Sequence, residues 1–240
     1  MKKINWNRFL GNFVFLSMLF AVVYIIVAMI LAPSPQDGAV LPYDRLKSDY
    51  VLMLLQCIVG LFAMLLPGML KKRLNIIIPS NMMIVYTIFL YCAIYLGEVR
   101  SFYYTFPHWD TILHTFSGAM LGALGFSFVN FLNNTDEVPI NLSPIFVSTF
   151  AFCFAVTLGV IWEIYEFTGD LVLGTNMQKF ALENGVLLVG QKALADTMKD
   201  LIVDIIGAFL MSAIGYISLK HKKGWLEKLL IKNKNIEKPV

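Results

Sequence analysis

Charged residues are scarce in this sequence. They make up 15% of its 240 residues, whereas a soluble domain of this length carries about 25%. Hydrophobic residues account for 58% of the chain, and the mean hydropathy is +0.70. The apolar residues are gathered into long runs, which is typical of a chain surrounded by lipid. The composition therefore excludes an ordinary soluble domain.

Several familiar motifs are also missing. The sequence has no zinc-finger spacing, no glycine-rich phosphate loop and no basic surface interleaved with aromatic residues, so a nucleic-acid partner is not expected. The three cysteines, Cys57, Cys92 and Cys153, stand inside apolar runs at a spacing that fits no metal motif. We interpret them as small buried hydrophobic residues.

Six apolar runs are long enough to cross a bilayer, which needs about 20 residues of helix. The sequence therefore predicts an all-α, polytopic membrane helix bundle in the bacterial cell membrane, with membrane lipids as its partners. Residues 1–219 form a single transmembrane domain, and residues 220–240 form a basic cytoplasmic tail. The predicted spans cover about 9–31, 50–70, 76–96, 111–132, 145–167 and 201–219, and the last two extend beyond the bilayer as helices.

The distribution of basic residues predicts the orientation. With the N-terminus in the cytoplasm, the cytoplasmic segments hold 13 of the 19 lysines and arginines, and the external segments hold 6. Because basic residues are retained on the cytoplasmic side, both termini are predicted to lie inside. The tail from Lys220 onward either lies on an anionic inner leaflet or is solvated.

Seven of the 16 acidic residues fall in three short stretches with helical spacing. Residues three, four or seven apart share one face of a helix, so each stretch presents its polar groups together. In the predicted topology all three stretches lie at the external ends of their helices. The stretches contain Asp110 with His114, then Glu163, Glu166 and Asp170, then Asp196, Asp200 and Asp204.

Each of these residues has a structural alternative. Asp110 and Asp196 can serve as helix N-caps, and Asp170 can be a solvated helix end. Glu163 and Asp204 are embedded in apolar sequence, where an unpaired charge costs at least about 2.5–3.5 kcal/mol. We therefore expect these groups to face the interior of the bundle, and we interpret them as functional.

Crowded carboxylates must share protons, pair with cations or bind a metal. Acidic oxygens with one imidazole suit Mg²⁺, Mn²⁺, Zn²⁺ or Fe²⁺. Glu163 and Glu166 are candidate catalytic bases, and Arg100 is a candidate ligand for an anionic headgroup. The predicted metal ligands are Asp110, His114, Glu166, Asp170, Asp196 and Asp200.

The order of these residues resembles the YjdF-type membrane-spanning proteins of bacteria. The similarity comprises Asp110, His114 and Gly118, then Glu163 and Glu166, then Asp196, Thr197 and Asp200 leading to Gly207. Asp204 belongs less clearly to this pattern. The resemblance implies a bacterial membrane location and supports these positions, but it implies no reaction.

Three functions fit the sequence. The first is a metal-dependent enzyme acting on a lipid or cell-envelope substrate. The second is an ion- or proton-coupled transporter, since intramembrane acids commonly form relays. The third is a non-catalytic scaffold in which the acids stabilise helix packing. The segment 168–200 is the one predicted loop large enough to form a lid.

Overall fold

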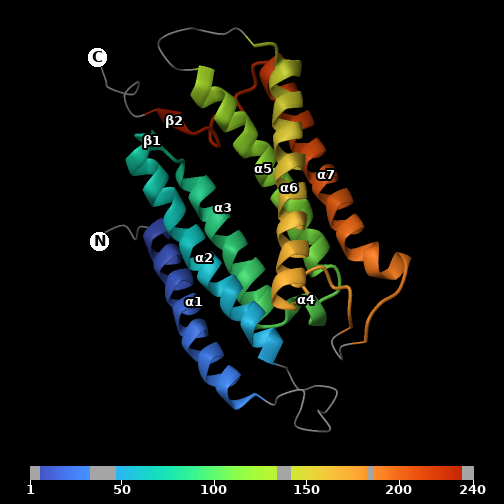
Figure 1. Cartoon of the computed structure of the whole chain (residues 1–240). Coiled ribbons are helices and arrows are strands. Elements are labelled where there is room, and N and C mark those ends of the chain that lie inside the picture. Colours follow the sequence, from blue (N-terminus) through green and yellow to red (C-terminus); the bar gives the residue numbers. More distant parts are fainter. Residues whose placement is uncertain (1–5, 33–46, 134–141, 183–185, 234–240) are drawn as a thin grey trace.

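The computed structural model describes residues 6–32, 47–133, 142–182 and 186–233 of the chain (Figure 1). Six of its helical segments are long and apolar enough to cross a membrane, which confirms the predicted all-α bundle. The elements are α1 (Trp6–Leu31), α2 (Lys47–Arg73), β1 (Ile76–Ile77), α3 (Ser80–Leu90), the π-helix η1 (Tyr91–Val99), α4 (Phe102–Thr105), α5 (Trp109–Asn133), α6 (Pro144–Leu173), α7 (Gln191–Lys220) and β2 (Lys232–Asn233).

The last two helices are longer than the hydrophobic runs that predicted them. Helices α6 and α7 contain 30 residues each, which at a rise of 1.5 Å gives roughly 45 Å against about 30 Å of hydrocarbon. Ser143 caps α6, because its hydroxyl accepts a hydrogen bond from the Phe146 amide, and Pro144 occupies the first turn. Both helices therefore continue past the predicted apolar runs, and these continuations include Asp170 in α6 and Asp196 in α7.

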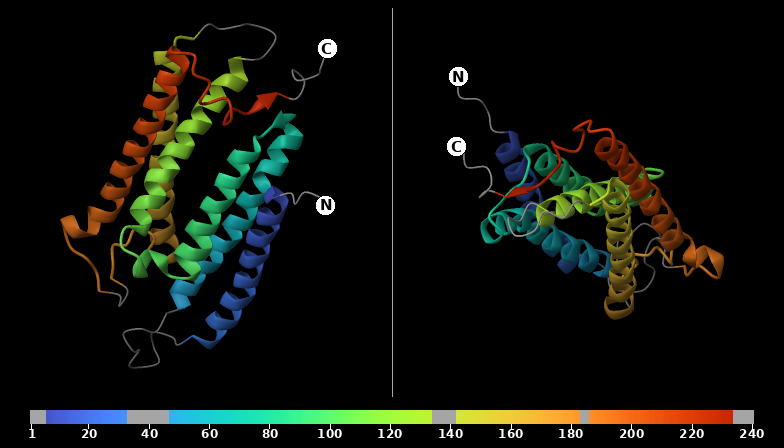
Figure 2. Two further views of the ribbon diagram at one scale, coloured as in Figure 1. Left: turned by 180° about the vertical axis from the view of Figure 1, so that it is seen from behind. Right: turned by 90° about the horizontal axis from the view of Figure 1, so that it is seen from above.

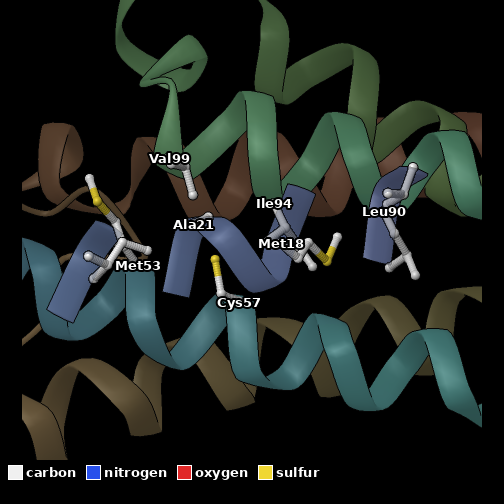
Figure 3. Close-up of a cluster of buried hydrophobic side chains, with 9 residues drawn as sticks. Met18, Ala21, Met53, Cys57, Leu90, Ile94 and Val99 are labelled. Atoms are coloured by element: carbon white, nitrogen blue, oxygen red, sulfur yellow. The ribbon is translucent and has the colours of Figure 1, made fainter. Parts of the chain in front are cut away.

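The bundle consists of two groups of three membrane-spanning segments that lie side by side (Figure 2). The first group contains α1, α2 and the continuous segment α3–η1. Its core includes Met18, Cys57 and Ile94, which are buried between these helices (Figure 3). The second group contains α5, α6 and α7, which all pack against one another. The polar residues singled out in the sequence lie mainly in this second group.

Glycines allow α5 and α7 to approach very closely. A Cβ atom added to Gly207 of α7 would meet the backbone carbonyl oxygen of Thr115, and one added to Gly118 of α5 would meet the carbonyl oxygen of Asp204. Gly122, one turn after Gly118, faces the side chain of Met211. Gly118 and Gly122 therefore form a small-residue face on α5 that lets α7 approach closely.

Large apolar side chains cover the outside of the helices. Phe20, Phe62, Phe209 and Leu171 are each at least 62% exposed, as expected of side chains that contact lipid. Cys153 is exposed on α6 and Cys92 is only half-buried, so the prediction of buried cysteines is wrong for Cys153 and holds fully for Cys57 alone. The apolar run predicted that Cys153 lies in a span but could not tell which face it occupies.

Part of the segment expected to form a basic tail packs back onto the bundle. Leu226 is 4% exposed. The Ser127 hydroxyl of α5 donates a hydrogen bond to the carbonyl of Leu229 and accepts one from the Ile231 amide. Strand β2 then pairs antiparallel with β1, which follows α2. These contacts tie the two helix groups together at the end of the bundle opposite the beginnings of α5 and α7; residues 234–240 lie outside the described part of the chain.

We expect both termini to be cytoplasmic, because six spans place them on the same side and the basic residues gather there. A reporter fused after Lys223 should behave as cytoplasmic, and one placed within 175–190 should behave as external. Enzymatic topology reporters in intact cells measure this directly. An external reporter after Lys223 would reverse the orientation and move the acidic residues to the cytoplasmic side.

Candidate metal centre

The acidic residues of α5 and α7 surround one histidine. Asp110 lies in the first turn of α5, and His114 follows one turn later. His114 Nε2 lies 3.7 Å from Asp110 Oδ1 and 4.0 Å from Asp200 Oδ2. The other ring nitrogen, Nδ1, lies 3.3 Å from Asp204 Oδ2. The imidazole is thus held between three carboxylates, and its two nitrogens face different partners.

Asp204 is more central than the sequence suggested. It is 4% exposed, and its two oxygens have separate partners. Oδ2 accepts from His114, while Oδ1 accepts a 2.8 Å hydrogen bond from the Ser117 hydroxyl. Since a carboxylate offers only acceptors, this contact requires a proton on Nδ1 of the histidine, while Nε2 faces the other two carboxylates.

Lys179 is a cation of the site that the sequence reasoning missed. Its ammonium group donates to Asp110 Oδ2 and lies 3.4 Å from Asp196 Oδ2. Burial lowers the pKa of Lys179, but the negative charges of Asp110 and Asp196 outweigh it, and the net pKa lies above the ordinary value. Lys179 therefore stays protonated and neutralises part of the acidic group.

The three acids of α6 share one buried face, as their spacing predicted. Glu163, Glu166 and Asp170 are 5%, 9% and 9% exposed. Glu166 Oε1 accepts a 2.9 Å hydrogen bond from the indole of Trp162. Both oxygens of Glu163 are buried, and neither has a hydrogen-bond partner among the described residues. Asp204 Oδ2 lies 2.9 Å from the position of a Cβ on Gly159, one turn before Glu163, so this face of α6 borders the histidine cluster.

Asp170 has a different task from the one its spacing suggested. Its carboxylate accepts hydrogen bonds from the Thr175 hydroxyl and from the backbone amides of Met177 and Gln178, at 2.7, 2.7 and 2.9 Å. Asp170 thereby fixes the loop that follows α6, and this loop carries Lys179 to Asp110. The structure does not bring Asp170 into the group around His114.

Two further predictions can be placed. Asp196 is the sixth residue of α7, which begins at Gln191, so it does not cap the helix; it contacts Lys179 instead. Arg100 lies away from the acidic group. It lines an open hollow of about 910 Å³ between α1, α2 and η1, together with tyrosines that include Tyr24 and Tyr50. The structure therefore does not place Arg100 where it could bind a substrate beside His114.

Among the described residues, Asp110, His114 and Asp200 form a group that could hold a metal ion. One ligand atom from each lies within 4.8 Å of the others. Asp200 is 1% exposed, and its Oδ1 has no hydrogen-bond partner in the described chain. Two carboxylates and an imidazole nitrogen converging in this way can hold a divalent cation after small side-chain movements.

A cavity of about 400 Å³ opens onto this set from between the two helix groups. Asp110, His114, Glu166 and Asp200 line its polar end. Tyr103, which precedes α5, also lines the cavity. Burial, followed by the charges of Glu98 and Asp110, raises the pKa of Tyr103 well above its ordinary value, so its hydroxyl stays protonated.

The fold and the buried polar group define a multi-pass integral membrane protein. A family model described as "Predicted membrane protein (DUF2238)" matches residues 14–221, and the chain belongs to this family. The expected membership of a membrane-protein family without an assigned reaction is therefore confirmed.

One curated relative shows how far the similarity extends. An uncharacterised protein of Thermotoga maritima is 30% identical over 138 residues, which is 57% of this chain and 62% of that protein. The chain thus matches less than two thirds of this relative's length. No solved structure matches the chain.

Proposed function

We propose that this protein is a metal-dependent membrane enzyme that acts on a lipid or cell-envelope substrate. The observation that carries the proposal is the orientation of His114. Asp204 holds Nδ1, so Nε2 faces Asp110 and Asp200. A carboxylate that fixes the second nitrogen of a ligating histidine is the usual support of a metal site, because it sets the tautomer and raises the basicity of the ligand.

The unsatisfied oxygens support the same proposal. Asp200 Oδ1 and both oxygens of Glu163 are buried without a partner in the described chain, and a buried carboxylate without a partner is costly. Four aspartates lie in contact with His114 or Lys179, so their negative charge exceeds what Lys179 balances alone or together with a protonated His114. A divalent cation between Asp110, His114 and Asp200 removes this excess.

The donor set narrows the choice of metal. An imidazole beside two carboxylates suits Mn²⁺, Zn²⁺ or Fe²⁺ better than Mg²⁺, which prefers oxygen ligands and keeps several waters. Three protein ligands leave coordination positions open, as in catalytic sites. The metal would supply a Lewis acid and an activated water.

The chain's own residues would then do the rest of the chemistry. Glu166 lines the cavity, and the Trp162 indole holds its carboxylate in place, so it is positioned to move a proton to or from a substrate. Glu163 is the alternative base, because it is buried on the same face of α6 and is not engaged by any described hydrogen bond. The ammonium group of Lys179, which donates to Asp110, would balance part of the negative charge before the metal arrives.

The position of the group favours an enzyme over a carrier. Asp110 lies in the first turn of α5, and the loop carrying Lys179 joins it, so the group sits at one end of the bundle. Carriers bind their ions near the middle of the membrane. In a scaffold the buried acids would be hydrogen-bonded, whereas here several of their oxygens have no hydrogen-bond partner in the part of the chain that the structure describes.

Replacing the group that orients the histidine tests the proposal. We expect Asp204→Asn to weaken divalent-metal binding by roughly 10- to 100-fold, because it disturbs the orientation and basicity of His114 without removing a ligand. Equilibrium dialysis of the purified protein with Mn²⁺ or Zn²⁺, followed by elemental analysis, measures the affinity. Affinity should also rise with pH, since the ligands must be deprotonated.

The matched control is Asp170→Asn, which makes the same change at a buried aspartate that holds the neighbouring loop instead. Because this loop carries Lys179 to Asp110 and Asp170 does not contact His114, the variant should change metal affinity less than Asp204→Asn does. Equal affinities for the Asp204 and Asp170 variants would count against a histidine-centred site. An unmodified protein that takes up none of these metals would refute the proposal.

A further inference from the structure

The cavity beside the acidic group has two chemically different ends. Its polar end contains the carboxylates of Asp110 and Asp200. Going down α5, Leu113, Ser117 and then Met120 and Leu121 follow along its wall, and the other walls at this depth include Phe89 and Leu158. The apolar end therefore lies deep in the bundle, between the two helix groups. Such a shape suits an amphiphile and not a small polar molecule.

The depth of the cavity matches one leaflet of a bilayer. Asp110 and Leu121 are eleven positions apart on one helix, which corresponds to roughly 16 Å at 1.5 Å per residue. The hydrocarbon core of a bilayer is about 30 Å thick. A lipid of the leaflet nearest Asp110 could thus place its headgroup at the acidic group and its chain in the apolar end without changing its depth.

Two residues in the wall of the cavity are partly exposed. Val59 of α2 and Trp162 of α6 both line it, yet their side chains are 37% and 39% exposed. Helices α2 and α6 do not pack extensively on each other in the described chain, although both form walls of the cavity. The gap between α2 and α6 is thus the side of the cavity at which its two walls pack least on each other.

We propose that the cavity binds one aliphatic chain of a membrane lipid that enters between α2 and α6, with its headgroup at Asp110, His114 and Asp200. This inference rests on the proposed function and names its substrate class, a lipid presented from within the membrane. An apolar cavity of about 400 Å³ lies within the size range of small-molecule sites, and its walls would be poorly hydrated. A lipid chain is the apolar ligand that surrounds the protein on all sides.

Photolabelling tests the proposal. The probe is a lysophosphatidylglycerol whose single acyl chain ends in a diazirine, added to the purified full-length protein. The expected crosslinks lie on peptides of α3 and α5 that contain Phe89 or Leu121. Leu121→Trp, which fills the deep end of the cavity, should abolish these crosslinks, and Ala93→Leu, a milder filling substitution on the opposite wall, should reduce them severalfold.

Leu132→Trp is the matched control, because Leu132 lies on the same helix, is 51% exposed and is outside the cavity. It should leave the crosslinks unchanged. Labelling confined to outward-facing residues, or labelling that neither filling substitution reduces, would overturn the proposal. The same experiment on His114→Ala distinguishes the lipid site from the metal site. If this variant loses metal binding but keeps the crosslinks, the lipid site stands without the metal site. If the unmodified protein binds metal but gives no crosslinks in the cavity, the metal site stands without the lipid site.

Discussion

Purified protein carrying His114→Ala or Asp200→Asn is expected to lose nearly all of its divalent-metal binding. His114→Ala removes a donor from a set of three and Asp200→Asn replaces an anionic oxygen donor by a neutral one, so the loss should exceed the roughly 10- to 100-fold that disturbing a supporting residue costs. Metal content per protein, measured by elemental analysis after dialysis, gives the result. Added metal should also raise the thermal stability of the unmodified protein, by about 2.7 kcal/mol at a concentration 100 times the dissociation constant, and should not stabilise either variant.

The two substitutions differ in what they do without metal. His114→Ala takes away the group hydrogen-bonded to buried Asp204, so the metal-free variant should itself be less stable. Asp200→Asn keeps the shape of the side chain and removes one negative charge from a crowded group, so it should fold well. His221→Ala is the control, because His221 follows α7 at the opposite end of the bundle. Unchanged metal binding in Asp200→Asn would remove Asp200 from the site.

A bulky side chain placed between α5 and α7 should destabilise the whole second helix group. Gly207→Leu would push a side chain onto the carbonyl oxygen of Thr115, where backbone and not a flexible side chain must move. Overpacking of this kind costs about 1–3 kcal/mol and more where the backbone must shift, so we expect about 3 kcal/mol or more. Thermal unfolding in detergent, followed by circular dichroism, measures the loss.

The same substitution should also weaken metal binding, because α5 carries Asp110 and His114 while α7 carries Asp200. Gly11 of α1 provides the control. A Cβ added there meets no atom within 4 Å, so Gly11→Ala should be neutral or should stabilise the helix by up to about 1 kcal/mol. If Gly207→Leu unfolds at the same temperature as Gly11→Ala, the close approach of α5 and α7 is not important for stability.

The bundle itself could be predicted well, because the length of an apolar run follows directly from the thickness of the bilayer. Helical spacing also predicted that Asp110 and His114 share a face, and that Glu163, Glu166 and Asp170 share another. The bounds of α6 and α7 were harder to predict from the sequence. Charged residues interrupt the apolar runs there, so the predicted span in α6 stopped before Asp170 and the predicted span in α7 began after Asp200.

The contacts of individual residues could not be predicted, because they leave no periodic pattern in the sequence. Lys179 lies in a loop, and only the hydrogen bonds that Asp170 makes with the next residues carry it to Asp110. Asp170 was predicted to be a metal ligand because its spacing places it on the same face of α6 as Glu163 and Glu166. In the structure, the loop after α6 forms hydrogen bonds with its carboxylate instead. Arg100 ends η1 on the side facing α1, a direction that the sequence around it does not encode.

Asp204 was the least certain member of the acidic set, because the family resemblance did not clearly include it. In the structure it holds both His114 and Ser117. A residue that orients a ligand is hard to recognise from spacing, since its role appears only when two helices are brought together. Here that juxtaposition depends on Gly118, which lets the α7 backbone at Asp204 approach α5.

The coordination shell of a bound metal tests the central claim most directly. X-ray absorption spectroscopy of the Zn²⁺-loaded protein should show one imidazole and carboxylate or water oxygens at about 2.0–2.2 Å, with no sulfur. In His114→Ala the imidazole signal should disappear, and in His221→Ala it should persist. A shell without imidazole in the unmodified protein, or an imidazole signal that survives in His114→Ala, would contradict a metal site built on Asp110, His114 and Asp200.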